Sequence, residues 1–152
     1  MDAEVDAILA EMSSIKERSR AVVRKLGDDG VRWKPAMPDT SSAAQLISHM
    51  FGGERSAVHG RIGGEAVTRD RDQEFSNPVS TVEGLLKVID EAEAGTKRVL
   101  ANETAQSLAR ELPANQPGTT TTAQKTLVHV VAHQAEHLGH MELTAQMRES
   151  SR

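Results

Sequence analysis

The sequence predicts an all-α protein whose 152 residues form a single four-helix-bundle domain, residues 1–152. Four segments carry apolar residues at the three- and four-residue spacing of amphipathic helices. No segment alternates between apolar and polar residues for long enough to indicate a strand. The only aromatic residues are Trp33, Phe51 and Phe75. The core must therefore be built from aliphatic and methionine side chains, which suits helices better than sheets.

The first predicted helix covers about residues 3–26 and ends at Gly27, a natural helix stop. Its apolar positions recur at steps of three, four or seven: Val5, Ile8, Met12, Ile15, Val22 and Leu26. The second helix begins after a run of good N-cap residues at 39–42. It extends to about Ile62, where the glycines 63–64 end it.

The third predicted helix follows Pro78 and Ser80, and one set of residues defines its buried face: Val82, Leu85, Ile89, Ala92, Thr96 and Val99. The fourth begins near residues 119–122 and runs to about Met147, with its own apolar set: Leu127, Val130, Val131, Leu138, Met141 and Ala145. Long connections join the second helix to the third and the third to the fourth. Amphipathic helices of about 20 to 28 residues, each roughly 30 to 40 Å long, pack most simply as a four-helix bundle.

Composition excludes several classes of protein. The formal net charge is −4, whereas binding to nucleic acid needs clustered excess Lys and Arg. The chain has no cysteine, which excludes disulfides, thiolate catalysis and zinc fingers. No apolar run approaches the roughly 20 residues that cross a bilayer, and the acidic start at residues 1–5 differs from an export signal. We therefore expect a cytoplasmic protein without nucleic-acid or membrane partners.

Four of the six histidines lie in the fourth predicted helix: His129, His133, His137 and His140. At 100° per residue they share an arc about 80° wide. Histidines one turn apart are about 6 Å apart along the axis and can converge on one cation, whereas the first and third are about 12 Å apart and cannot. The pairs 129/133, 133/137 and 137/140 all remain open. A stable metal site needs a third ligand, which must come from another helix.

The second predicted helix offers His49, which shares its face with small or polar residues that include Gln45. Such a face either lines a cavity or faces solvent, and periodicity does not choose between the two. Glu54 and Glu136 are interpreted as carboxylates at the surface or at the bundle edge. The alternative role for each is to accept the N–H of a metal-bound imidazole and so orient it. His59, near a helix end, is given no functional role.

Three elements occur in an order that resembles the DinB/YfiT-like superfamily of metal-dependent four-helix-bundle proteins. Trp33-Lys34-Pro35 resembles the Trp-x-Pro entry before the second helix of that family. Residues 42–50, followed by Glu54, resemble the helix that carries its first metal-binding histidine. Residues 127–140 contain the His-x-x-x-His-x-Gly stretch of its last helix. Residues 62–75 are also similar to a segment of some members.

The resemblance implies a metal triad of His49, His133 and His137, and so selects the middle of the three geometric pairs. His140 stands where many members have Gln, and His129 becomes a neighbour of the site. Five further residues are expected to line the pocket around the triad or to contact its ligands: Gln45, Glu54, His129, Glu136 and His140. The family includes proteins similar to S-transferases and isomerases that use low-molecular-weight thiols. A homodimer is also expected.

Three neutral imidazoles leave open coordination positions, as a catalytic metal needs, and imidazole suits Zn²⁺, Ni²⁺ and Fe²⁺. Together with the resemblance, this chemistry predicts a metal-dependent enzyme that activates a small thiol or water, of the thiol S-transferase or hydrolase type. Its small-molecule substrate binds between the second and fourth helices, with residues 63–77 as a lid. One alternative is a non-catalytic metal-binding or metal-sensing bundle. The other is a dimeric interaction module with a pH-responsive histidine stripe.

Overall fold

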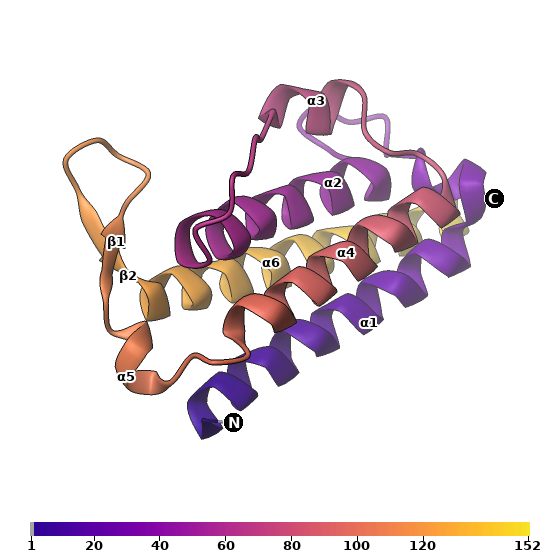
Figure 1. Ribbon diagram of the computed structural model, residues 1–152. Coiled ribbons are helices and arrows are strands. Elements are labelled where there is room, and N and C mark those ends of the chain that lie inside the picture. Colours follow the sequence, from indigo (N-terminus) through magenta and orange to yellow (C-terminus); the bar gives the residue numbers. More distant parts are fainter. Residues whose placement is uncertain (1) are drawn as a thin grey trace.

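The computed structural model describes residues 2–152 and confirms the predicted helical bundle. Its long helices are α1 (Ala3–Val31), α2 (Ala43–Glu54), α4 (Val82–Leu100) and α6 (Ala123–Ser150), which pack side by side (Figure 1). A π-helix, η1 (Arg55–Ile62), continues α2 without a break. The long connections carry the short elements: α3 (Arg71–Ser76), α5 (Ala105–Leu108), β1 (Glu111–Pro113) and β2 (Thr120–Thr122). Every helix within residues 2–152 is too short or too polar to span a lipid bilayer.

Gly27 breaks the first helix but does not end it. Its backbone has φ 69° and ψ 175°, a conformation that glycine adopts without steric cost, and one more helical turn follows to Val31. This turn is held in place because Asp28 Oδ1 accepts a hydrogen bond of 2.7 Å from the backbone N–H of Val82. The extra turn therefore joins the end of α1 to the start of α4, a tertiary contact that periodicity does not reveal.

The expectation that the chain has no strand is wrong for one small hairpin. β1 and β2 pair antiparallel, with Leu112 opposite Thr121, and the hairpin extends beyond the bundle next to α5 (Figure 1). Each strand has three residues, which is too short for an alternating pattern to appear in the sequence. Because β2 takes residues 120–122, α6 begins at Ala123, with Thr122 as its N-cap.

A buried carboxylate joins the four long helices. Glu54 Oε1 lies 2.9 Å from Lys16 Nζ of α1 and accepts a hydrogen bond of 2.5 Å from Thr96 Oγ1 of α4. Its Oε2 accepts a hydrogen bond of 2.5 Å from Gln134 Nε2 of α6. Both Lys16 and Glu54 are 1% exposed. The interpretation of Glu54 as a surface or bundle-edge carboxylate is therefore wrong, because its oxygens face the bundle interior.

Removal of the Glu54 charge should destabilise the whole bundle. A Glu54→Ala variant leaves the Lys16 ammonium buried without a counter-charge, and we expect a loss of about 3–5 kcal/mol in the free energy of unfolding, measured by urea denaturation. The double variant Lys16→Met/Glu54→Gln removes both charges and should lose less. A loss below about 1 kcal/mol for Glu54→Ala would contradict this role of the ion pair.

Candidate metal centre

His49 of α2 and both His133 and His137 of α6 meet in a single cluster. His49 Nε2 lies 3.0 Å from His133 Nε2, and His137 Nε2 lies 3.1 Å from the same atom. The three donor nitrogens all lie within 4.8 Å of one another, and His49 is 7% exposed. The structure thus places His49 at a buried cluster rather than on a solvent face, and it brings together the middle pair of the α6 histidines.

The donor set and its spacing fit a divalent first-row cation. Two imidazole nitrogens that each lie about 2.1 Å from one ion are about 3.0 Å apart when they subtend a right angle at it. The two closest nitrogen separations in the cluster agree with this value. Three imidazoles suit Zn²⁺, Ni²⁺ or Fe²⁺, and the ligand type does not distinguish among them.

The outer nitrogen of His49 has a carboxylate partner, which fixes the tautomer of the ring. His49 Nδ1 lies 3.2 Å from Glu74 Oε1, and an ionised carboxylate only accepts hydrogen bonds. Arg69 Nη2 also lies 3.2 Å from Nδ1, but it donates to Glu74 Oε1 at the shorter distance of 2.8 Å. We therefore place the proton on Nδ1, which leaves the lone pair of Nε2 directed at the cluster.

Glu74 reaches His49 because α2 carries a glycine at the point of contact. A Cβ atom at Gly52 would lie 2.2 Å from Glu74 Oε2, so a larger residue would push the carboxylate away. The Phe75 ring packs on His49 with 5.1 Å between ring centroids. α3 and the residues just before it therefore cover the outer side of His49. Arg69 and Glu74 were placed only in the expected lid, without a role at the triad, although a Gly-Gly pair inside a helical pattern indicates close approach of another segment.

The other predicted pocket residues lie around the cluster with different partners. His140 is exposed, with Nδ1 3.4 Å from His137 Nδ1, and the exposed His129 stacks on His133 at 6.2 Å between centroids. Gln45 completes a capping box with Ser42 and donates to the Phe75 carbonyl. Glu136 is exposed on α6. The outer carboxylate of the triad is thus Glu74, rather than Glu54 or Glu136.

Both α6 histidines of the cluster favour the neutral form. Burial lowers the pKa of His133 to about 4, and the nearby rings of His137, His49 and His129 and the Arg69 guanidinium act in the same direction. Burial also lowers the pKa of His137. A neutral imidazole is the form that binds a metal, so the lone pairs of these rings are available to a cation at neutral pH.

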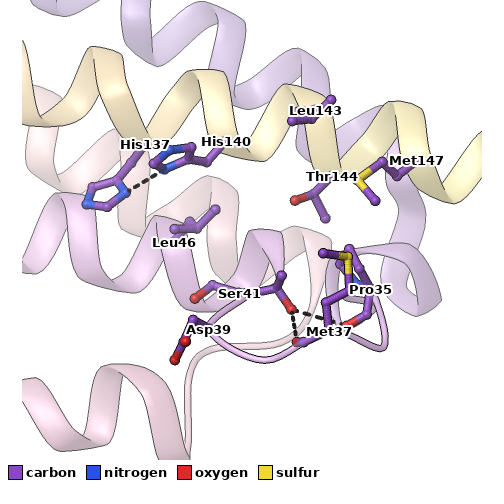
Figure 2. Close-up of a pocket in the computed structure, with 11 residues that line it drawn as sticks. Pro35, Met37, Asp39, Ser41, Leu46, His137, His140, Leu143, Thr144 and Met147 are labelled. Atoms are coloured by element: carbon purple, nitrogen blue, oxygen red, sulfur yellow. Dashed lines mark hydrogen bonds between the residues drawn. The ribbon is translucent and has the colours of Figure 1, made fainter.

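Two hollows border the cluster and share none of their lining residues. A polar cleft of about 250 Å³ is lined by His49 and His133 together with three arginines, Arg61, Arg69 and Arg71. A second pocket of about 400 Å³ lies on the His137 side and is mostly apolar. Figure 2 shows His137 and His140 at one end of this pocket, with the loop that carries Met37 facing the side of α6 that carries Met147. A molecule can therefore approach the three rings from either side.

Comparisons with known proteins identify the family of this chain. The family model described as the DinB superfamily matches residues 11–141, a range that covers most of the chain and includes positions 49, 133 and 137. The chain belongs to the DinB superfamily. A search of curated proteins finds no match.

Solved structures show the same fold as this DinB superfamily chain. A conserved protein from Enterococcus faecalis superposes with a TM-score of 0.76 at 15% identity, with 96% of each chain covered. A DinB-like protein from Bacillus cereus gives 0.74 at 14% identity, and one from Bacillus subtilis gives 0.71 at 21% identity. Both of these matches cover 96% of this chain and 92% of the other. At these identities the likeness shows the fold alone.

The lowered pKa of His133 predicts a loss of stability in acid for the metal-free protein. The ordinary pKa of histidine is about 6.5, so the unfolded chain binds a proton at this site before the folded chain does. The free energy of unfolding should therefore fall as the pH drops from about 6.5 towards 4. Urea denaturation at several pH values measures this slope, which should be smaller in His133→Gln. Equal slopes in the two proteins would contradict the assignment.

Proposed function

We propose that this DinB superfamily protein is a metal-dependent enzyme in which His49, His133 and His137 hold one divalent cation, Zn²⁺, Ni²⁺ or Fe²⁺. When bound, the cation supplies Lewis acidity, which makes a small thiol or water a nucleophile near neutral pH. The activity is that of a thiol S-transferase or hydrolase acting on a small molecule. The observation that carries the proposal is the convergence of three ring nitrogens from two helices within 4.8 Å of one another.

The surrounding residues hold and shield this site. Glu74 accepts the Nδ1 proton of His49 and so keeps Nε2 free, and Arg69 holds Glu74 through two hydrogen bonds of 2.8 and 2.9 Å. Phe75 packs against one side of the His49 ring, with 5.1 Å between the ring centroids. Residues 63–77 form the proposed lid, because Arg69, Glu74 and Phe75 all belong to this segment.

A catalytic site is better supported than a purely structural one. A structural zinc site has four protein ligands, whereas this cluster offers three. The two hollows leave space beside the rings for a thiol, water or substrate. The third hypothesis, a pH-responsive interface, receives less support, because the cluster nitrogens face one another across the α2–α6 contact rather than outward. The expected homodimer stays a prediction.

Metal content of untagged protein tests the site directly. His133→Ala should abolish stoichiometric metal measured by elemental analysis, because His133 Nε2 is central to the cluster. His129→Ala is the matched control, since His129 lies one turn away on the same helix and is exposed, and it should keep the metal. Metal-loaded wild type should then turn over electrophiles with one of several cellular thiols, while His133→Ala should not. Full retention of metal in His133→Ala would remove the proposed site.

The role of Glu74 predicts a weaker site when its charge is removed. Glu74→Gln keeps the size of the side chain but makes it a poorer acceptor for the Nδ1 proton of His49. We expect the metal affinity to fall by roughly 10–100-fold, as is typical when the partner of a ligating histidine is changed. Competition with a chelator measures the affinity. Glu136→Gln, an exposed change on α6, should leave the affinity unchanged, and an equal loss in both variants would contradict the role of Glu74.

A further inference from the structure

The polar cleft beside the cluster carries positive charge, and two of its arginines, Arg61 and Arg71, have no role in the proposed reaction. Arg61 of η1, Arg69 and Arg71 line it together with Asn115 and His129. The only carboxylate in its lining is Glu54, and both Glu54 oxygens are occupied by Lys16, Thr96 and Gln134. The cleft therefore has no free negative group of its own.

Among the arginines of the cleft, Arg61 is the one with a buried nitrogen left unpaired in the described part of the chain. Its Nε is buried and has no hydrogen-bond partner within residues 2–152, and no carboxylate of these residues forms an ion pair with it. Burial also lowers the pKa of its guanidinium. A partly buried cation without a counter-charge is unfavourable, and a ligand that brings negative charge to the guanidinium would remove the penalty.

The positive lining continues past the cleft. A neighbouring hollow of about 210 Å³ shares Arg61, Asn115 and His129 with the cleft and adds Lys125 at the start of α6. Its lining contains no carboxylate. Arg69 differs from Arg61, because its Nε and Nη2 bind Glu74, so it contributes less to the binding of a new anion.

We propose that this arginine-lined cleft binds a carboxylate or phosphate group of the small molecule that reacts at the cluster, with Arg61 as its anchoring residue. Guanidinium groups bind both kinds of anion through paired N–H donors. The proposal rests on the proposed function for the reaction that follows, since His49 and His133 line the same cleft. Binding of the anion itself does not require the metal. The substrate class is thus a small anionic molecule whose charged end lies towards Arg61.

Titration with simple anions tests the cleft separately from the metal. Inorganic phosphate and succinate serve as probes, with binding followed by NMR at constant ionic strength in metal-free wild type, Arg61→Gln and Arg55→Gln. Arg55 lies on the same π-helix, is exposed and does not line the cleft, so this control makes the same change of charge. We expect the dissociation constant to rise about tenfold or more in Arg61→Gln and to change little in Arg55→Gln.

The same titrations in metal-loaded protein separate the two proposals. Anion binding that depends on Arg61 with and without metal supports the cleft, and it does so even if the protein fails to hold metal. A preference for phosphate over succinate, or the reverse, identifies the anionic group. Binding that appears only with metal and is the same in Arg61→Gln would assign the anion to the cation and overturn the proposal. No binding of either probe, or equal weakening in both arginine variants, would also overturn it.

Discussion

The contacts of the Glu54 carboxylate hold the four long helices of this protein in one arrangement. Glu54 stands at the end of α2, and its partners come from α1, α4 and α6. An ion pair with both members 1% exposed is unfavourable unless its geometry is kept, so the helices cannot shift without breaking it. Gln134, which binds Glu54, directly follows His133. The interaction that sets the spacing of α2 and α6 in the core therefore also sets the distance between the histidines of the cluster.

The sequence predicted the bundle well because apolar periodicity reports directly on which helix faces are buried. It missed the hairpin and the extra turn after Gly27, since both depend on local geometry in stretches too short for periodicity. The α6 histidines could be placed on one face from spacing alone, but spacing left three pairs open. The family resemblance predicted that His49 joins the pair of His133 and His137, and the structure places the three rings together.

The surroundings of the cluster were harder to predict for a physical reason. Arg69 and Glu74 belong to a connection without regular periodicity, and their position depends on how that connection folds back over α2. The absence of a Cβ at Gly52 permits this approach, and only the structure shows which residue uses the space. Glu54 was assigned to an edge although its spacing places it with Ile47, Phe51 and Val58 on a buried face. A charged residue in an apolar stripe indicates a buried pair, and its partner, Lys16, lies too far away in the chain to be identified by spacing.

Anomalous diffraction from crystals of the metal-loaded protein, recorded at the absorption edge of the added ion, would locate the cation. We expect one strong peak about 2.0–2.2 Å from the Nε2 atoms of His49, His133 and His137, with at least one further coordination position filled by a non-protein ligand. A peak at any other place in the molecule, or none in a crystal soaked with the ion, would contradict the three-histidine centre.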